Sequence, residues 1–416
     1  MSSIPLFGVI LTLIVAILFG EQAFFYLRVT KFAEGLKNPR RYRILTNIVF
    51  LVFNLPMAFL FTFHSHTATL PSWVLYVTFY PIYVWHFAFF ILFFIIIIGK
   101  VLKIPFLSIG WILKQFEGTR KFHQQIQDKR SVQNFNKNRR VFIRQGVTIL
   151  AGATFVGSAL GEANRNDYAI TDITIPINNL PGQFQGFTIS LLSDVHSSVF
   201  MSKEQMQEYV RAANALNPDL SIVTGDFVNS MLDEVYPFAE AFSELKAPYG
   251  VYGVLGNHDF FTRAVDKVAR EVDDCGVKLL RDQRMDITRN GQKIYLLGVD
   301  DVGSPRHAAG RFDLTLRGAD LSIPKIMLCH RPYFFPQAAE RNIDLTLSGH
   351  THGGQIVLAR IGNEVLAPAR IASHYVAGLY KIDSAQMYVS RGIGTVGIPI
   401  RINCPPEITK ITLAKA

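Results

Sequence analysis

The stretch that decides the fold is DLTLSGHTHGGQI, residues 344–356, in which an apolar run ends at two histidines separated by one residue. Successive side chains of an extended chain point to opposite faces, so His350 and His352 share one face. A second His-x-His pair, His64 and His66, lies in a stretch without acidic residues and is predicted to lie at a membrane surface. The glycine-rich surroundings of the first pair therefore make it the better candidate for chemistry.

The same pattern recurs upstream, where four further apolar runs of strand length each end in carboxylate, amide or imidazole groups. These runs are FTISLLS (187–193), LSIVT (220–224), VYGVL (251–255) and KIMLC (325–329). In an open α/β sheet, binding sites form outside the carboxyl ends of the strands, so we expect the residues after the five runs to meet at one edge. They are Asp194, His196, Asp226, Asn257, His258, His330, His350 and His352.

Amphipathic segments separate several of these runs. In residues 203–217, Met206, Val210 and Ala213 recur at helical spacing, and a second segment ends in Gly276, which is typical of a helix stop. Strands that alternate with helices in this way predict an α/β domain in which helices cover a mixed sheet or two packed sheets. Each polar residue alone has an ordinary explanation as a cap or turn residue, but their joint placement favours a metal site.

Five blocks carry a resemblance to a known family: Asp194-Val195-His196, Gly225-Asp226, Gly256-Asn257-His258-Asp259, His330 and Gly349-His350-Thr351-His352. In this order they resemble the blocks of the calcineurin-like metallophosphoesterases. GHTHGGQ (349–355) together with GIGTVGIPIRINCPPEITKITL (392–413) is similar to the YkuE-like membrane-associated branch. The resemblance covers residues 183–414 and implies a four-layer α/β/β/α sandwich for a domain over residues 164–416.

The resemblance also implies two divalent metal ions. One ion would be bound by Asp194, His196, Asp226 and His352. The other would be bound by Asp226, Asn257, His330 and His350. The shared aspartate would offset the repulsion between two neighbouring cations, and nitrogen and oxygen ligands without thiolate suit Mn, Fe, Co or Zn better than Ca or Mg. A hydroxide activated by both metals would attack phosphorus, and His258 would protonate the leaving oxygen or stabilise its charge.

Four further residues have predicted roles around this centre. Related phosphatases often orient the histidine with an aspartate three residues after the Gly-Asp aspartate, where this chain has Asn229, so the orientation of His258 is left open. Gln355 is predicted to hydrogen-bond a metal ligand. Arg331 is a candidate for contact with the substrate phosphate, with an ordinary solvated loop charge as the alternative. Asp259 is predicted to brace its loop rather than to bind metal.

The N-terminal part of the chain has a different character, and we interpret residues 1–137 as a transmembrane module. Three apolar stretches in it are long enough to cross a bilayer, at 5–27, 44–63 and 73–99. Residues 138–163 form a shorter fourth apolar segment with Arg139-Arg140 near its start, which resembles a twin-arginine export signal. An ordinary fourth span with a basic flank is the alternative, and both place the following domain on the same side.

The charge distribution predicts how these spans are oriented. Residues 1–144 carry a net charge of +13 and residues 145–416 a net charge of −3, so the basic excess lies in the loops beside the spans. By the positive-inside rule, these loops face the cytoplasm. We therefore predict a multi-pass protein of the cytoplasmic (inner) membrane with its catalytic domain on the extracytoplasmic side and no nucleic-acid partner.

The predicted activity is that of a membrane-anchored, metal-dependent phosphoesterase that hydrolyses mono- or diesters, with a lipid ester among the candidate substrates. Membrane attachment leaves open a second hydrolase, a pyrophosphohydrolase of a lipid-linked nucleotide-sugar. A third interpretation is a non-catalytic membrane sensor or scaffold, which the Asn229 departure favours and the complete ligand set disfavours. The three cysteines, Cys275, Cys329 and Cys404, are far apart, which excludes a disulfide-rich scaffold and a cysteine-based zinc site.

Overall fold

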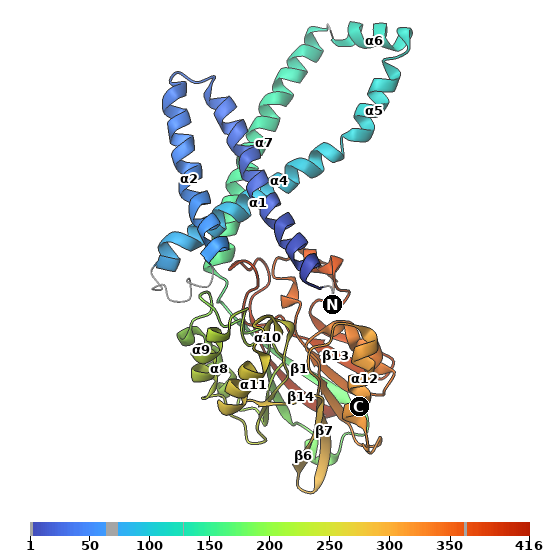
Figure 1. Cartoon of the computed structure of the whole chain (residues 1–416). Coiled ribbons are helices and arrows are strands. Elements are labelled where there is room, and N and C mark those ends of the chain that lie inside the picture. The colour runs from blue at the N-terminus through green and yellow to red at the C-terminus, as the bar shows by residue number, and fades with distance from the viewer. Residues whose placement is uncertain (1–2, 64–73, 128, 362–363) are drawn as a thin grey trace. The chain divides into compact units, whose positions relative to one another are not determined.

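The computed structural model of the chain describes residues 3–63, 74–127, 129–361 and 364–416 (Figure 1). His64 and His66 lie outside the described residues. The chain divides into two compact units. Of the described residues, the helical unit comprises 3–63 and 74–160, and the α/β unit comprises those from 161 to 416.

The described residues of the helical unit are mostly helical. Its elements are α1 (Ser3–Ala33), α2 (Pro39–Phe63), the π-helical η2 (Leu75–Phe79), α4 (Tyr80–Val101), α5 (Ile104–Leu113), α6 (Glu117–Gln127) and α7 (Arg130–Ala163). Among the described residues, Pro39–Phe59 and Val77–Leu113 are long and apolar enough to cross a membrane, and Thr148–Ala163 is a shorter apolar helix. The predicted span 5–27 lies within α1, and the segment predicted at 138–163 is the second part of α7.

Aromatic contacts and a buried amide connect α1, α2 and α4 within this unit. The ring of Phe25 in α1 lies 4.6 Å from that of Phe89 in α4, and Trp85 in α4 stacks on Phe53 in α2 at 4.3 Å. The indole Nε1 of Trp85 donates a hydrogen bond to Oε1 of Gln22 in α1 (2.9 Å). Polar side chains that bond across helices stabilise bundles in an apolar environment, so this unit has the internal contacts that a membrane bundle needs.

Two six-stranded sheets form the centre of the α/β unit. In spatial order the first sheet contains β1 (Ala169–Ile177), β14 (Glu407–Lys415), β2 (Thr188–Leu192), β3 (Leu220–Val223), β4 (Val251–Gly253) and β5 (Lys278–Leu279). The second contains β12 (Gly378–Ile382), β13 (Ala385–Val389), β9 (Leu345–Ser348), β8 (Lys325–Leu328), β7 (Gln292–Gly298) and β6 (Gln283–Arg289). A separate hairpin is formed by β10 (Ala359–Ile361) and β11 (Glu364–Leu366). The five runs predicted to end at the site are all strands.

Helices cover the outer faces of both sheets. They are α8 (Lys203–Ala215), α9 (Val235–Phe242), α10 (Asn257–Phe261), α11 (Val265–Asp274), α12 (Pro305–Leu316) and α13 (Phe335–Ala339). Short 3-10 turns are η3 (Gly182–Phe184), η4 (Leu232–Glu234), η5 (Pro332–Phe334), η6 (His352–Gly354) and η7 (Pro368–Ile371). In Figure 1, α8, α9 and α11 lie on one flank of the domain and α12 on the opposite flank.

Three buried apolar clusters hold these layers together. Leu191 of β2 packs with Leu296 of β7 and Leu347 of β9 in the cluster between the two sheets. Phe238 of α9 belongs to the cluster under the helices of the first sheet, and Phe312 of α12 to the cluster on the second. Because each sheet buries one face against the other sheet and one against helices, the predicted four-layer α/β/β/α sandwich is confirmed.

The strand directions explain where the site forms. In the first sheet β2, β3 and β4 are parallel neighbours, and in the second sheet β7, β8 and β9 are parallel neighbours. The carboxyl ends within each set therefore lie at one edge, as the crevice rule requires. β14 lies between β1, to which it is parallel, and β2, to which it is antiparallel.

Candidate metal centre

The loops after β2, β3, β4, β8 and β9 bring the predicted metal-ligating side chains together. Three overlapping groups have ligand atoms within 4.8 Å of one another, and every member is buried except His258 and His350, which are half-buried. The groups are Asp194–His196–His352, His196–Asp226–His258 and Asp226–His330–His350. They contain every aspartate and histidine that the sequence predicts at the centre, so residues up to 158 positions apart in the chain share one site.

Asp226 lies between the groups. Its Oδ2 is 3.5 Å from Nε2 of His196 and 3.2 Å from Nε2 of His330. Its Oδ1 accepts a hydrogen bond from the main-chain N–H of His258 (2.8 Å), which restricts rotation of the carboxylate. One oxygen that faces a histidine from each side is in the position that a bridging carboxylate requires.

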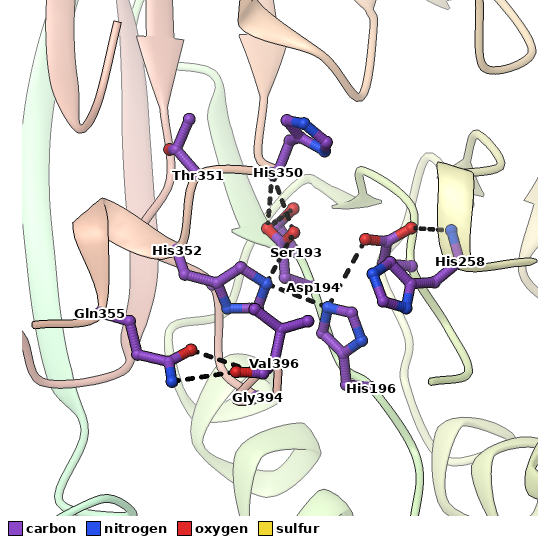
Figure 2. Close-up of polar contacts among 12 residues, drawn as sticks. Ser193, Asp194, His196, His258, His350, Thr351, His352, Gln355, Gly394 and Val396 are labelled. Atoms are coloured by element: carbon purple, nitrogen blue, oxygen red, sulfur yellow. Dashed lines mark hydrogen bonds and ion pairs between the residues drawn. The ribbon is translucent and has the colours of Figure 1, made fainter. Parts of the chain in front are cut away.

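Asp194 organises the other end of the centre. Its carboxylate accepts the main-chain N–H of His350 (2.8 Å) and the hydroxyl of Ser193 (2.6 Å). Nε2 of His352 lies 3.5 Å from Asp194 Oδ1 and 3.0 Å from Nε2 of His196 (Figure 2). The two imidazole nitrogens and the carboxylate oxygen thus point to one small volume from three directions.

The backbone at the centre is held in an uncommon conformation. Positive φ angles occur at Asp194 (51°), His196 (47°), Asp226 (54°), His350 (75°) and His352 (51°). Residues other than glycine rarely adopt this region, and each instance costs of order 1 kcal/mol or more. A Cβ added to Gly349 would collide with Ser193 Oγ and the Asp194 carboxylate, and one added to Gly256 would collide with the Asp226 carboxylate. The glycines in the two motifs are therefore required for close approach of the backbone to the carboxylates.

Burial and the neighbouring charges set the protonation of the histidines. Burial lowers the pKa of His196 to about 3, that of His350 to about 2 and that of His352 to about 3, so these rings are neutral at pH 7. Burial also acts to lower the pKa of His330, but the charge of Asp226 outweighs it and raises that pKa to about 10. Neutral imidazole is the form that binds metals. His196, His350 and His352 are therefore already in the metal-binding form, whereas His330 carries a proton that a metal would displace.

Two further details show that these residues fit a divalent metal. Nδ1 of His330 donates to the main-chain oxygen of Thr224 (2.7 Å), which turns Nε2 toward the centre. Oδ1 of Asn257 is buried and accepts no hydrogen bond, and an unpaired buried oxygen is costly unless a cation or donor contacts it. Imidazole nitrogens, carboxylate oxygens and an amide oxygen are the ligands that Mn, Fe, Co and Zn accept together.

The structure shows what each of the four predicted supporting residues contacts. Asp259 braces its loop as predicted, because its carboxylate accepts four main-chain N–H groups. The side-chain amide of Gln355 bonds the main chain of Val396 and Ile398 rather than a metal-ligating side chain. Arg331 forms a two-pronged ion pair with Asp301, at 2.6 and 2.7 Å. The orientation of His258 comes from the main-chain oxygen of Asn229, which accepts its Nδ1–H at 2.5 Å.

Sequence reasoning missed two residues at the centre. The ring of Tyr333 lies 5.2 Å from that of His350. The guanidinium of Arg401 is buried and donates to the main-chain oxygens of Gly394, Cys404 and His352 (3.1, 3.1 and 3.5 Å). Arg401 lies in the stretch 392–413 that carries the resemblance, but its role was not predicted because its partners are main-chain groups whose directions depend on the folded loops.

A buried cluster of nitrogen and oxygen ligand atoms lies at the strand ends of an α/β/β/α sandwich and fits divalent metal ions. The family model described as calcineurin-like phosphoesterase matches residues 187–354. The uncharacterized metallophosphoesterase YkuE of Bacillus subtilis (strain 168) is 31% identical over 276 residues, which cover 64% of this chain and 93% of YkuE. The chain belongs to the calcineurin-like phosphoesterase family, as the sequence motifs predict.

Two animal proteins named transmembrane protein with metallophosphoesterase domain are also similar. The protein from Bos taurus is 30% identical over 301 residues, which cover 69% of this chain and 66% of the relative. The protein from Danio rerio is 32% identical over 258 residues, which cover 59% of this chain and 57% of the relative. The chain thus spans less than two thirds of the length of either. These relatives and the two apolar helices indicate membrane association.

Proposed function

We propose that this protein is a membrane-anchored phosphoesterase whose centre holds two divalent metal ions and hydrolyses phosphate mono- or diesters. The observation that carries the proposal is the position of Asp226. One of its oxygens lies within 3.5 Å of His196 from one group and of His330 from the other. A carboxylate between two sets of imidazoles supports a pair of cations better than a single one.

The side chains of the three overlapping groups, together with Asn257, divide between the two ions. Asp194, His196 and His352 would hold the first ion, and His330, His350 and the Asn257 oxygen would hold the second, with Asp226 shared between them. When bound, the ions would supply an activated water and would neutralise the phosphate oxygens. Their identity is proposed as Mn, Fe, Zn or Co from the ligand types.

His258 is placed to handle the proton of the leaving group. Its Nδ1–H is bonded to the main chain of Asn229, so Nε2 is the nitrogen that remains to face a substrate. Its ring packs edge-on against His196 at 4.5 Å and is half-buried, so a substrate can reach it. A histidine in this position, when protonated, donates from Nε2 to the departing oxygen while the main-chain bond keeps the ring aligned.

The membrane anchor supports an extracytoplasmic location for the α/β unit. Both basic segments, 28–43 and 100–144, flank apolar helices, and the positive-inside rule assigns such segments to the cytoplasm. A catalytic domain tethered beside a bilayer has lipid phosphate esters within reach, so a lipid ester is a candidate substrate. The twin-arginine-like signal at 138–163 stays a prediction.

The test uses the full-length protein, purified in detergent and loaded with Mn²⁺. Metal content is measured by plasma mass spectrometry, and turnover is measured on p-nitrophenyl phosphate and bis-p-nitrophenyl phosphate. We expect about two ions per chain and a loss of at least one in Asp226→Asn. His258→Ala should retain its metal and lose less than about 3-fold in turnover on these esters, because nitrophenolate leaves without a general acid, and roughly 100-fold on an alkyl phosphodiester. Two bound ions without turnover on either ester would favour the scaffold, and fewer than one ion in folded protein would overturn the proposed centre.

A further inference from the structure

His258 is aimed by a main-chain carbonyl rather than by a side-chain carboxylate. The main-chain oxygen of Asn229 accepts its Nδ1–H, whereas the Asn229 side chain donates its Nδ2 to the hydroxyl of Ser230 (3.3 Å). A carbonyl accepts only, so this contact requires the hydrogen on Nδ1 of the ring. The direction of one peptide group therefore decides where Nε2 of His258 points.

That peptide group belongs to a turn that is closed by a single carboxylate oxygen. Oε2 of Glu234 accepts the consecutive main-chain N–H groups of Asn229 (2.9 Å), Ser230 (2.7 Å) and Met231 (2.9 Å). Three amides that converge on one carboxylate oxygen form a main-chain nest. Burial raises the pKa of Glu234 to about 7, while the three N–H donors act to lower it because they stabilise the charged form. Loss of this side chain would remove all three bonds at once.

Glu234 is also fixed from the other side. The residue is 5% exposed, and its main-chain oxygen accepts a hydrogen bond from the hydroxyl of Ser197 (2.7 Å). The main-chain oxygen of Ser197 in turn accepts the N–H of Asn229 (3.2 Å). Ser197 follows His196 in the chain. Its two contacts therefore connect Glu234 and the 229–231 turn to the loop after β2, which carries the metal-ligating candidate His196.

We propose that Glu234 is a positioning residue for His258, which it orients by holding the Asn229 carbonyl. This inference rests on the proposed function, in which His258 protonates the leaving group. Glu234 touches neither the substrate nor the metal-ligating atoms, and it acts through the 229–231 turn. It supplies in this chain the orientation that an aspartate side chain at the Asn229 position supplies in related phosphatases.

The test compares Glu234→Ala with Glu234→Gln in the full-length, metal-loaded protein. All three hydrogen bonds go to one oxygen, so the amide oxygen of glutamine can keep them and alanine cannot. Asp219→Ala is the matched control, because Asp219 also binds a main-chain N–H and a hydroxyl, both from Thr188, but lies outside the centre. Phosphodiesters with leaving groups of increasing basicity are used as substrates, since general-acid catalysis matters most for poor leaving groups.

For Glu234→Ala we expect turnover to fall roughly 100-fold on an alkyl ester and by less than about 3-fold on a nitrophenyl ester, as His258→Ala would. Glu234→Gln and Asp219→Ala should keep the wild-type dependence on the leaving group. Hydrogen–deuterium exchange should show faster exchange of the amides of residues 229–231 in Glu234→Ala alone. An equal loss on every ester, or unchanged exchange of these amides, would overturn the role of Glu234. A wild-type protein without metal-dependent turnover would count against the proposed function instead.

Discussion

Asp259→Ala removes a carboxylate that accepts hydrogen bonds from the main-chain N–H groups of Asp226 (3.1 Å), Phe227 (2.9 Å), Val228 (3.2 Å) and Gly256 (2.8 Å). Each carboxylate oxygen takes two of these donors, and the side chain is fully buried. The bonds tie the loop after β3 to the loop after β4. The change therefore loosens both loops that carry the central part of the metal site.

The expected loss follows from these four bonds. A hydrogen bond contributes about 1 kcal/mol net, and a buried donor left without an acceptor costs about 1–3 kcal/mol. Four donors therefore correspond to a destabilisation of about 4 kcal/mol or more. In a domain of this size a loss of 1 kcal/mol lowers the melting temperature by about 2–4 °C, which gives a fall of about 8–16 °C.

The assay is thermal unfolding of the full-length protein in detergent, followed by differential scanning calorimetry. Asp259→Asn should not rescue the loss, because its NH₂ group would face two of the donors that need an acceptor. Asp219→Ala, which frees one main-chain donor and one hydroxyl away from the site, should fall by only a few degrees, about 2–4 °C per kcal/mol. A shift for Asp259→Ala no larger than that of Asp219→Ala would refute the reasoning.

Three further outcomes follow from the same geometry. Because a metal must displace the proton that Asp226 stabilises on His330, whose pKa is raised to about 10, metal affinity should rise roughly tenfold per unit between about pH 6 and 8. Titration calorimetry in two buffers should detect about one released proton, and a pH-independent affinity would contradict the assignment. Gly349→Ala should abolish metal retention, measured by plasma mass spectrometry, because its Cβ would overlap Ser193 Oγ; retained metal would contradict this steric argument. A cysteine at exposed Ser322 (Ser322→Cys) should react with an impermeant thiol reagent in intact cells, and labelling only after lysis would reverse the proposed topology.

The meeting of the ligands could be predicted because it depends on strand order and on little else. Asp194, Asp226 and Asn257 each follow a short apolar run, and parallel strands bring their carboxyl ends to one edge. The positions of single atoms were beyond such reasoning. Asn229 is the clearest case. An asparagine in place of the expected aspartate suggests that His258 has lost its hydrogen-bond partner, whereas the main-chain oxygen of Asn229 accepts that hydrogen bond.

Backbone conformation at the centre was also hidden from the sequence. Asp194, His196 and Asp226 adopt positive φ angles that local preference assigns first to glycine. The surrounding sheet ends and the hydrogen bonds of the neighbouring loops impose this geometry, and neither can be read from the residues themselves. The place of β14 inside the first sheet was equally unpredictable, since its apolar pattern indicates a strand but not its neighbours.

The position of β14 has a consequence for biogenesis. Residues 407–415 pair with Ala169–Ile177 on one side and with β2 on the other, so the first sheet is incomplete until that late segment has been synthesised. A ribosome-bound chain with β1 and β2 already made would expose unpaired strand edges, which promote aggregation. The first sheet, whose strand ends carry Asp194, Asp226 and Asn257, can therefore be completed only after translation has passed residue 415.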